Sequence, residues 1–553
     1  MLNNFSRKTL LAGFIGVVSS LSAASFNSLV QEDVNLYVSI RSMADSRAQW
    51  EGHPLGAVMQ DPEVLDFFEP WFQKPADGDD DESITEALEN DFDLTWEEFF
   101  ELFPGQMAFA LFDLPELWLG ETERPQLVLM AEYAGEYDQI TDLMDIQFER
   151  NAAKHRELNP EAEHALIEES FMGETLYFDE VFDGEKTYIE DGFALVDGVF
   201  ILATPEERLR SAVEAFKDEP ETALSEQAAY IRSREEGGRG DLEVYLNLEA
   251  ILPPLNAALV QKLMQSGAFM IGLNPNSLDT MLALDSMQAL FFDLDLTDTG
   301  VESHSGLLYR EKEGLLSLLS YTDAPLAEAR FVPEGVFSTS INNFDVGEML
   351  AQFERLLSAA SPNLRAQIDT QLQTARINTG VDLRTAILEN FSADVVSLSI
   401  MPEAAREATL APEPDQIYAI ALEDAEALSS AIEALKDLMP GVRDQIVAQD
   451  FAGQTIHTVK ATQVPDSPGV AARSLSYVIT RSYLIISMGR PVLLQEVLSN
   501  LESGEDGFWQ KAETEALFES MERSNVVSRS YLDIEALVFS VFQTMVQTSQ
   551  FGG

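Results

Sequence analysis

The residues with the most direct chemical use are the carboxylates of one short acidic run. Asp77-Gly-Asp-Asp-Asp-Glu-Ser83 places five carboxylates within six positions, among them Asp79, Asp80 and Asp81. Ca²⁺ prefers hard oxygen ligands of this kind, although the run lacks the spacing of an EF-hand loop. We therefore predict Asp77, Asp79, Asp80 and Asp81 as candidate calcium ligands, with a solvated loop as the alternative interpretation.

A second acidic segment, Asp293-Leu-Asp-Leu-Thr-Asp-Thr-Gly300, carries acids at alternating positions. In a strand, alternate residues point to the same face of the sheet. We expect Asp293 and Asp295 on the solvated face, so calcium binding here is the weaker alternative.

The sequence gives little support to catalysis by cysteine, by histidine or by the common catalytic motifs. The chain has no cysteine, which excludes thiol catalysis and a lipoprotein anchor. Its five histidines are scattered, and the nine-residue separation of His155 and His164 does not place both on one helical face. A zinc site or a histidine triad is therefore disfavoured. The usual nucleophile, phosphate-loop and zinc-protease motifs are also missing from the sequence.

The N-terminus has the order of a secretory signal peptide. Arg7 and Lys8 precede an apolar run, Thr9–Val18, which gives way to small residues. We predict residues 1–24 as the signal peptide, with cleavage after Ala24 and export to the periplasm or beyond. An uncleaved anchor is the minor alternative. No later stretch has the length of a membrane span.

Charge narrows the range of partners. The sequence has 95 acidic and 34 basic residues, a net charge of −61. Nucleic-acid binding needs a basic footprint, and this sequence has none. Lysine makes up less than a third of the basic residues. Low lysine with abundant carboxylate is typical of a protein adapted to a salty exterior, where ions screen self-repulsion.

Short segments recur in the same order along the two halves of the chain, which predicts a tandem duplication. Two unrelated domains with similar element lengths are the alternative. The matched pairs are Asp93-Leu94 with Asp382-Leu383, Gln126–Met130 with Gln416–Ile420, Ser170–Thr175 with Asp450–Thr455, Tyr188–Arg210 with Tyr477–Val497, and Tyr245–Ile251 with Tyr531–Leu537.

Alternating apolar runs such as Leu36–Ile40 predict strands. Apolar residues at three- and four-residue spacing predict acidic amphipathic helices between them, for example Tyr137–Arg150 and Ala425–Leu438. The fold class is therefore α+β, with two tandem related domains, each a mostly antiparallel sheet with helices packed on it. We place the domains at 25–325 and 326–553. A closing meander, Met281–Leu296, Val301–Arg310 and Gly314–Tyr321, ends the first domain, and Arg232–Gly240 is expected as an exposed loop.

Two features that resemble sites have structural interpretations. Asn247 and Asp533 each follow a strand and precede a helix, as Asp345 does, so we expect helix N-caps. Aromatic residues cluster at 67–72 and in Trp96-x-x-Phe99-Phe100-x-x-Phe103. Their helical spacing favours apolar faces packed on a sheet over a ligand groove.

The segments Asn35–Met43, Trp50-x-x-x-Pro-Leu-Gly56, Gln60–Val64 and Phe331-Val-Pro-Glu-Gly335 carry a resemblance. In these segments the chain resembles large exported bacterial proteins of unknown function with two tandem divergent α+β repeats. The resemblance implies no catalytic or binding residues.

Together these features favour an exported, non-enzymatic protein that binds a partner or serves an envelope role. The alternatives are an extracytoplasmic hydrolase that uses carboxylates and a calcium-dependent surface module. Spacing cannot identify a catalytic carboxylate pair, because close pairs are inevitable among so many acids.

Overall fold

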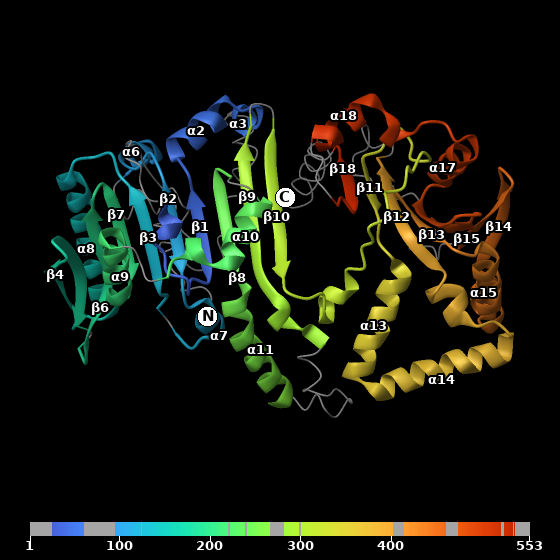
Figure 1. Ribbon diagram of the computed structural model, residues 1–553, viewed down its shortest axis with the longest axis horizontal. Coiled ribbons are helices and arrows are strands. Elements are labelled where there is room, and N and C mark those ends of the chain that lie inside the picture. The colour runs from blue at the N-terminus through green and yellow to red at the C-terminus, as the bar shows by residue number, and fades with distance from the viewer. Residues whose placement is uncertain are drawn as a thin grey trace. The chain divides into compact units, whose positions relative to one another are not determined.

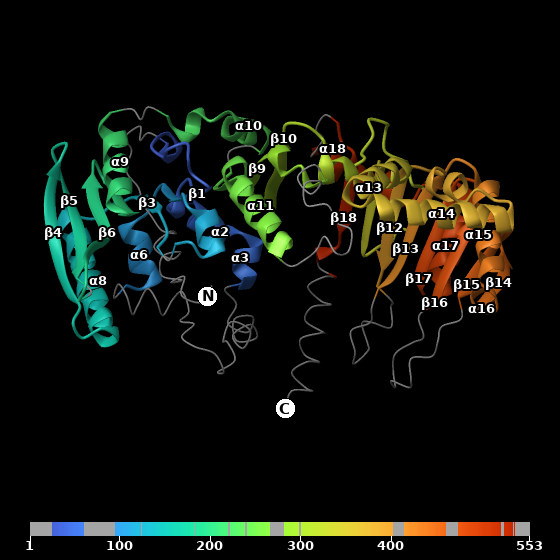
Figure 2. The ribbon, with the colours of Figure 1, turned by 90° about the horizontal axis from the view of Figure 1, so that it is seen from below.

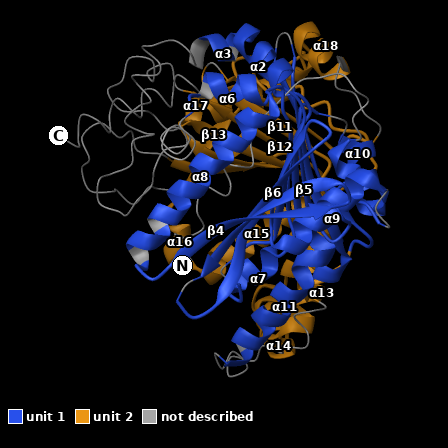
Figure 3. Ribbon diagram, turned by 90° about the vertical axis from the view of Figure 1, so that its left-hand side faces the viewer, with its two compact units in different colours: residues 1–267, 284–312 blue, residues 268–283, 313–553 orange. Residues whose placement is uncertain are grey.

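The computed structural model divides the chain into two compact units, shown in separate colours in Figure 3. The first comprises residues 1–267 and 284–312, and the second comprises 268–283 and 313–553. The structure describes residues 25–59, 94–122, 124–182, 184–218, 222–237, 240–265, 281–297, 300–401, 414–459, 474–520, 525–534 and 536. The predicted signal peptide lies outside these residues.

The first unit is built on one ten-stranded sheet, in which every pairing between neighbouring strands is antiparallel (Figure 1). Its strand order is β10-β9-β8-β1-β2-β3-β7-β6-β5-β4. The strands are β1 (Leu36–Ile40), β2 (Met107–Leu111), β3 (Leu127–Glu132), β4 (Glu163–Phe171), β5 (Glu174–Phe182), β6 (Thr187–Val196), β7 (Val199–Thr204), β8 (Leu242–Asn247), β9 (Met287–Leu296) and β10 (Val301–Tyr309).

The second unit has an eight-stranded antiparallel sheet in the order β14-β15-β16-β17-β13-β12-β11-β18. The strands are β11 (Ser338–Asn342), β12 (Phe391–Ile400), β13 (Asp415–Leu422), β14 (Ile446–Phe451), β15 (Gln454–Val459), β16 (Ser474–Ile479), β17 (Tyr483–Gly489) and β18 (Ser528–Leu532).

The two sheets share one topology. The order β8-β1-β2-β3-β7-β6-β5-β4 matches β18-β11-β12-β13-β17-β16-β15-β14 position by position, and the first unit adds β9 and β10 beyond β8. Segments matched in the sequence fall at equivalent places: Tyr245 lies in β8, and Tyr531 lies in β18. This confirms an α+β fold with two related domains in tandem.

Helices pack on both faces of each sheet. In the first unit the elements are η2 (Phe26–Ser28), α2 (Met43–Gly52), α3 (Pro54–Met59), α6 (Trp96–Leu102), α7 (Leu114–Leu119), α8 (Tyr137–Leu158), α9 (Glu206–Lys217), η3 (Leu224–Glu226), α10 (Ala228–Gly237), α11 (Leu248–Gln265) and η5 (Leu284–Ser286). In the second they are η6 (Gly314–Leu318), α13 (Val346–Ala360), α14 (Pro362–Thr379), the π-helical turn η7 (Arg384–Leu388), α15 (Ala425–Leu438), α16 (Pro440–Arg443), α17 (Pro491–Ser503), η9 (Phe508–Gln510) and α18 (Ala512–Ser520). Within the described ranges, no helix combines the length and apolar composition that a bilayer crossing requires.

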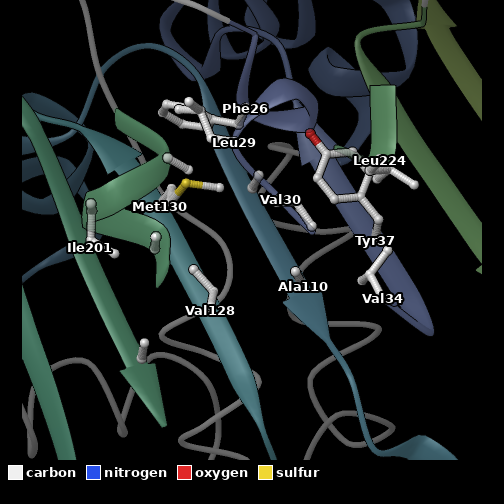
Figure 4. Packing of buried hydrophobic residues seen from close by; sticks show 14 of the residues in the cluster. Phe26, Leu29, Val30, Val34, Tyr37, Ala110, Val128, Met130, Ile201 and Leu224 are labelled. Carbon is white, nitrogen blue, oxygen red and sulfur yellow. The ribbon is translucent and has the colours of Figure 1, made fainter. Parts of the chain in front are cut away.

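The first core forms because alternate residues of each strand face opposite layers. On β3, Val128 and Met130 join the layer under α9 and α10, whereas Leu129 and Ala131 join the layer under α6 and α8. Figure 4 shows the first of these layers, with Tyr37 among the labelled side chains.

The predicted N-caps are confirmed. Asn247 accepts a hydrogen bond from the backbone N–H of Ala250, and Asp533 accepts one from Ala536. Asp345 caps α13 in the same way. The repeated strand-to-helix motif therefore serves structure.

Three expectations about the end of the first domain are wrong. Gly314–Leu318 is a 3-10 helix rather than a strand. Arg232–Gly237 belongs to α10, which packs on β9 and β10 and buries Tyr230 and Ser233. Because α10 covers this face of the sheet, Asp293 is buried rather than solvated, with 3% of its surface exposed.

The chain leaves the first unit for the last time after Lys312, and the expected boundary near residue 325 lies just inside the second unit. Tyr321 pairs with Phe344, and the backbone N–H of Thr322 donates to the carbonyl of Asn343. These contacts fix the connecting segment to the strand-to-helix turn after β11.

Candidate functional site

The predicted calcium ligands Asp77, Asp79, Asp80 and Asp81 lie outside the residues that the structure describes. Among the described residues, no group of three or more histidine and acidic side chains is arranged to hold a metal ion. The acidic run therefore stays a prediction from sequence. The second segment has a different character, because Asp293 lies in the protein interior.

A pocket of about 350 Å³ lies between α2 and α6 in the first unit. Backbone bonds fix its walls: the N–H groups of Met43 and Ala44 donate to the carbonyls of Gly105 and Pro104, just after α6. Both helices also have side-chain caps, from Ser42 on α2 and Thr95 on α6. The residues that line the pocket are Met43, Ser46, Arg47, Trp50, Glu51, Glu97 and Phe100.

The helix α6 serves two surfaces at once. Phe99 and Phe103 are buried in the core layer beneath α8, with their ring centroids 5.2 Å apart. Phe100 is partly buried against the same layer and also lines the pocket, together with Glu97. The aromatic face is thus packed on the core as predicted, and Phe100 in addition contributes to a concave surface that spacing alone did not favour.

Charge in the pocket is arranged unevenly. The Arg47 guanidinium lies 5.2 Å from the centroid of the Phe100 ring, and its Nε bonds Glu51 at 2.6 Å. Glu97 has no ion-pair partner among the described side chains. The pocket therefore combines apolar walls with a net negative charge at its rim.

Two of the segments behind the sequence resemblance form this pocket. Asn35–Met43 supplies β1 and the lining residue Met43 at the start of α2, and the motif from Trp50 to Gly56 contributes Trp50 to the wall. A Cβ added to Gly56 would lie 1.8 Å from the Trp50 carbonyl oxygen, so the chain can turn back against α2 only with glycine there. Trp50 is 36% exposed and stacks on His53.

A second arrangement, which the sequence did not reveal, brings histidines and carboxylates together under α8. Nδ1 of His155, on α8, lies 2.9 Å from Nε2 of His164, on β4. Nδ1 of His164 lies 3.0 Å from Oδ1 of Asp179, on β5. Figure 2 shows α8 beside β4, β5 and β6. The side chains of His164 and Asp179 are almost completely buried.

A β-bulge brings further acidic residues close to this hydrogen-bonded line of side chains. The β5–β6 register shifts between Phe178 and Glu180, which places Asp179 opposite Glu190 and Asp191. Burial, followed by the charge of Glu190, raises the pKa of Asp179 to about 7. Burial, followed by the charges of Asp179 and Glu190, raises the pKa of Asp191 to about 7. Burial lowers the pKa of His164.

Helical spacing missed this cluster because the two histidines lie on different elements. The helix was expected to end at Arg150, but it continues to Leu158, and the chain then folds back into β4. Residues nine apart therefore meet across a helix-to-strand turn. The signal that could have found the pair is Asn159-Pro160, a turn sequence between them.

The second unit has different chemistry at the equivalent place. Tyr177 on β5 stacks on Phe193, and at the matching position His457 on β15 stacks on Tyr477, with ring centroids 4.7 and 4.8 Å apart. There the buried Lys436 of α15 bonds Glu433 at 2.6 Å. The aromatic stack is common to both units, whereas the histidine and carboxylate chain belongs to the first.

Comparison with protein-family models finds no matching family, and no curated protein matches the chain. Among solved structures, the chain is similar to the one titled "Structure of crystal form I of TP0453", with 8% sequence identity and a TM-score of 0.23. The match covers 52% of this chain and 80% of that chain. So low a TM-score carries no argument about fold or function.

Proposed function

We propose that this protein is exported and binds a partner by receiving an apolar or aromatic side chain in the α2–α6 pocket. The lining of the pocket carries the proposal. Met43, Trp50 and Phe100 line an open pocket of about 350 Å³ between two capped helices, and backbone hydrogen bonds join the start of α2 to the segment after α6. Concave, mostly apolar sites of this size are typical of ligand binding, and aromatic anchors dominate the energy of protein interfaces.

Electrostatics favours a basic partner. Arg47 is paired with Glu51, so Glu97 leaves a net negative charge beside the apolar walls. The chain as a whole carries −61. Such a field accelerates association with a basic surface and repels an acidic one. The expected ligand is therefore a segment with an aromatic or aliphatic side chain flanked by lysine or arginine.

Binding explains the pocket better than hydrolysis does. The carboxyl groups with strongly raised pKa values are Asp179 and Asp191, in the cluster under α8, and Asp293 on β9, and none of the three lines the pocket. The pocket itself offers aromatic rings and an internally paired arginine, which suit contact and recognition.

The test uses the mature protein and two matched tryptophan variants. Trp50→Ala removes a pocket wall, whereas Trp118→Ala removes a tryptophan on α7 that is more exposed and does not line the pocket. Each protein is immobilised, incubated with an envelope extract of its own cell, and washed. Bound proteins are identified by mass spectrometry. The same proteins are titrated by calorimetry with the peptides Lys-Phe-Lys, Glu-Phe-Glu and Lys-Gly-Lys.

We expect a captured protein that is lost with Trp50→Ala and kept with Trp118→Ala. We also expect Lys-Phe-Lys to bind at least tenfold more tightly than either other peptide, as anchor residues contribute about 2 kcal/mol or more. Capture and peptide binding that do not depend on Trp50 would contradict the proposal and direct attention to hydrolysis.

A further inference from the structure

We propose that the hydrogen-bonded chain of His155, His164 and Asp179 is an acid-sensitive latch, which holds the C-terminal half of α8 on the sheet and opens when both imidazoles are protonated. This inference is independent of the proposed pocket function. It rests on the connection between three elements, α8, β4 and β5, through one buried line of polar atoms.

The two halves of α8 are held by different kinds of contact. Ile140, Leu143 and Met144 anchor the first half in the core layer under α6 and α8. In the second half, Ala152 is buried, Phe148 packs edge-on against the His164 ring, and His155 supplies a hydrogen bond to the sheet. Apolar contacts do not titrate, so a change in pH acts on the contact between His155 and His164.

The number of protons on the two imidazole rings decides whether the latch is closed or open. The 2.9 Å separation between Nδ1 of His155 and Nε2 of His164 requires one hydrogen between the two nitrogens. With both rings neutral, His155 donates to His164, and His164 donates to Asp179. One added proton is tolerated, because a single hydrogen still lies between the rings. When both rings are imidazolium, two N–H groups face each other and the contact breaks.

The surrounding charges set the order of protonation. The charged groups that act on His164 are Asp179 on β5, Glu190 on β6 and Arg156 on α8, and Asp191 on β6 interacts with Asp179 and Glu190. Arg124, which precedes β3, lies 3.5 Å from Glu190 and offsets part of its charge. Burial lowers the pKa of His164, the charge of Glu190 raises it, and the charge of Arg156 lowers it further.

As the pH falls through about 7, Asp179 and Asp191 take up protons first, because their pKa values are raised to about that value. Neutral acids no longer stabilise two neighbouring imidazolium rings. Further acidification therefore separates the rings instead of forming a stable charged pair. A buried carboxylate and two coupled histidines thus convert external acidity into movement of one helix end.

The absence of native cysteine provides a direct assay. Ala152→Cys places a thiol on the buried side of α8, and Ala153→Cys places one on its exposed side. Each mature variant is reacted with a pyridyl disulfide reagent, which works in mild acid, between pH 7.5 and 5. The reaction rate of Ala152→Cys is divided by that of Ala153→Cys, so that the pH dependence of thiol reactivity common to both cancels. The ratio then reports how often the end of α8 separates from the sheet.

We expect this ratio to rise at least tenfold between pH 7.5 and 5, and to be independent of pH when His155→Gln is added to both variants. His164→Gln removes the same titration and replaces His155→Gln if that protein does not fold. His304→Gln, on β10, controls for the loss of a histidine and should leave the rise intact. The proposal would be wrong if the ratio of the two rates did not change with pH in the protein that keeps both histidines. It would also be wrong if the ratio still rose in acid after His155→Gln.

Discussion

Glu243 on β8 lies directly opposite Asp293 on β9, and both carboxyl groups are buried beneath α10. A Cβ added to Gly237 of α10 would lie 2.2 Å from Oδ2 of Asp293, so the helix end rests on that side chain. Arg234 lies 3.8 Å from Glu243. Burial, followed by the charge of Glu243, raises the pKa of Asp293 to about 6.

This pair predicts that mild acid stabilises the first unit. The ordinary pKa of an aspartate is about 3.9, so folded Asp293 binds a proton over a range in which the unfolded chain does not. Its contribution to stability is complete below about pH 4 and is lost as the pH rises through about 6. Asp293→Asn should remove roughly 2 kcal/mol of the fall in unfolding free energy between pH 4 and 7.5.

Chemical denaturation at several pH values measures the effect of Asp293→Asn. Glu302→Gln, on the exposed part of β10, is the control and should keep the original pH dependence. An unchanged profile in Asp293→Asn would show that the carboxyl group is ionised throughout.

The shared topology predicts equal effects at equivalent turns. Met172-Gly173 joins β4 to β5 and Ala452-Gly453 joins β14 to β15, and all four residues have positive φ. Alanine in place of Gly173 or Gly453 meets no atom within 4 Å, so its cost is conformational, about 1 kcal/mol for each variant.

Gly335→Ala, at an open position without positive φ, is the matched control and should be neutral within about 0.5 kcal/mol. Thermal unfolding of the three variants makes the comparison. A cost at one turn and none at the other would contradict the equivalence of the two hairpins.

On α6, Phe99 is buried in the core and Phe100 lines the pocket, which predicts different effects when each is replaced. Phe99→Ala opens a cavity in the core and should lower the unfolding free energy by about 3 kcal/mol. Phe100→Ala should cost about 1 kcal/mol, because that side chain is partly buried. Ligand binding should show the reverse order, with Phe100→Ala weakening it more. Equal losses of stability would argue that Phe100 is simply core.

Much of the fold could be predicted from the sequence, because strands and helices leave periodic patterns. The prediction of β1 as Leu36–Ile40 and of α15 as Ala425–Leu438 matches the structure residue for residue. The error at α10 has a physical cause: its exposed charges and terminal glycines are typical of a loop, and only tertiary packing shows that Tyr230 and Ser233 are buried. That one missed helix led to the incorrect placement of Asp293 in solvent.

The candidate sites were harder to predict, because they depend on contacts between elements. Phe100 and Trp50 meet only because α2 and α6 lie together, and no spacing rule relates them. The pair of His155 and His164 needs both the true end of α8 and the direction of β4. The predicted acidic loop, by contrast, was local, and it lies outside the described residues.

Export is testable by the N-terminal sequence of the mature protein. Cleavage after Ala24 should leave Ser25 as the first residue, which places the fully buried Phe26 next to the new terminus. N-terminal sequencing of protein isolated from the periplasm or medium should read Ser-Phe-Asn-Ser. Protein recovered only from the cell interior with its first residues intact would contradict export.

The charge of −61 predicts that salt stabilises the protein, because ions screen repulsion between carboxylates. The unfolding midpoint should rise by several degrees between 0.1 and 1 M sodium chloride. The same titration at pH 4.5, where many carboxylates are protonated, should give a smaller rise. A midpoint that does not change with salt at neutral pH would count against adaptation to a salty exterior.

Alignment of the two sheets shows where the two related domains differ. Tyr245 and Tyr531 match, so register places Ile341 and Arg529 of the second unit where the first has Ser39 and Glu243. An apolar side chain has thus been exchanged for a hydroxyl at one position, and a cation for an anion at the other. Each domain can therefore be read as a natural set of substitutions in the other. Positions that are the same in both domains belong to the shared fold, and positions that differ belong to what is particular to one domain.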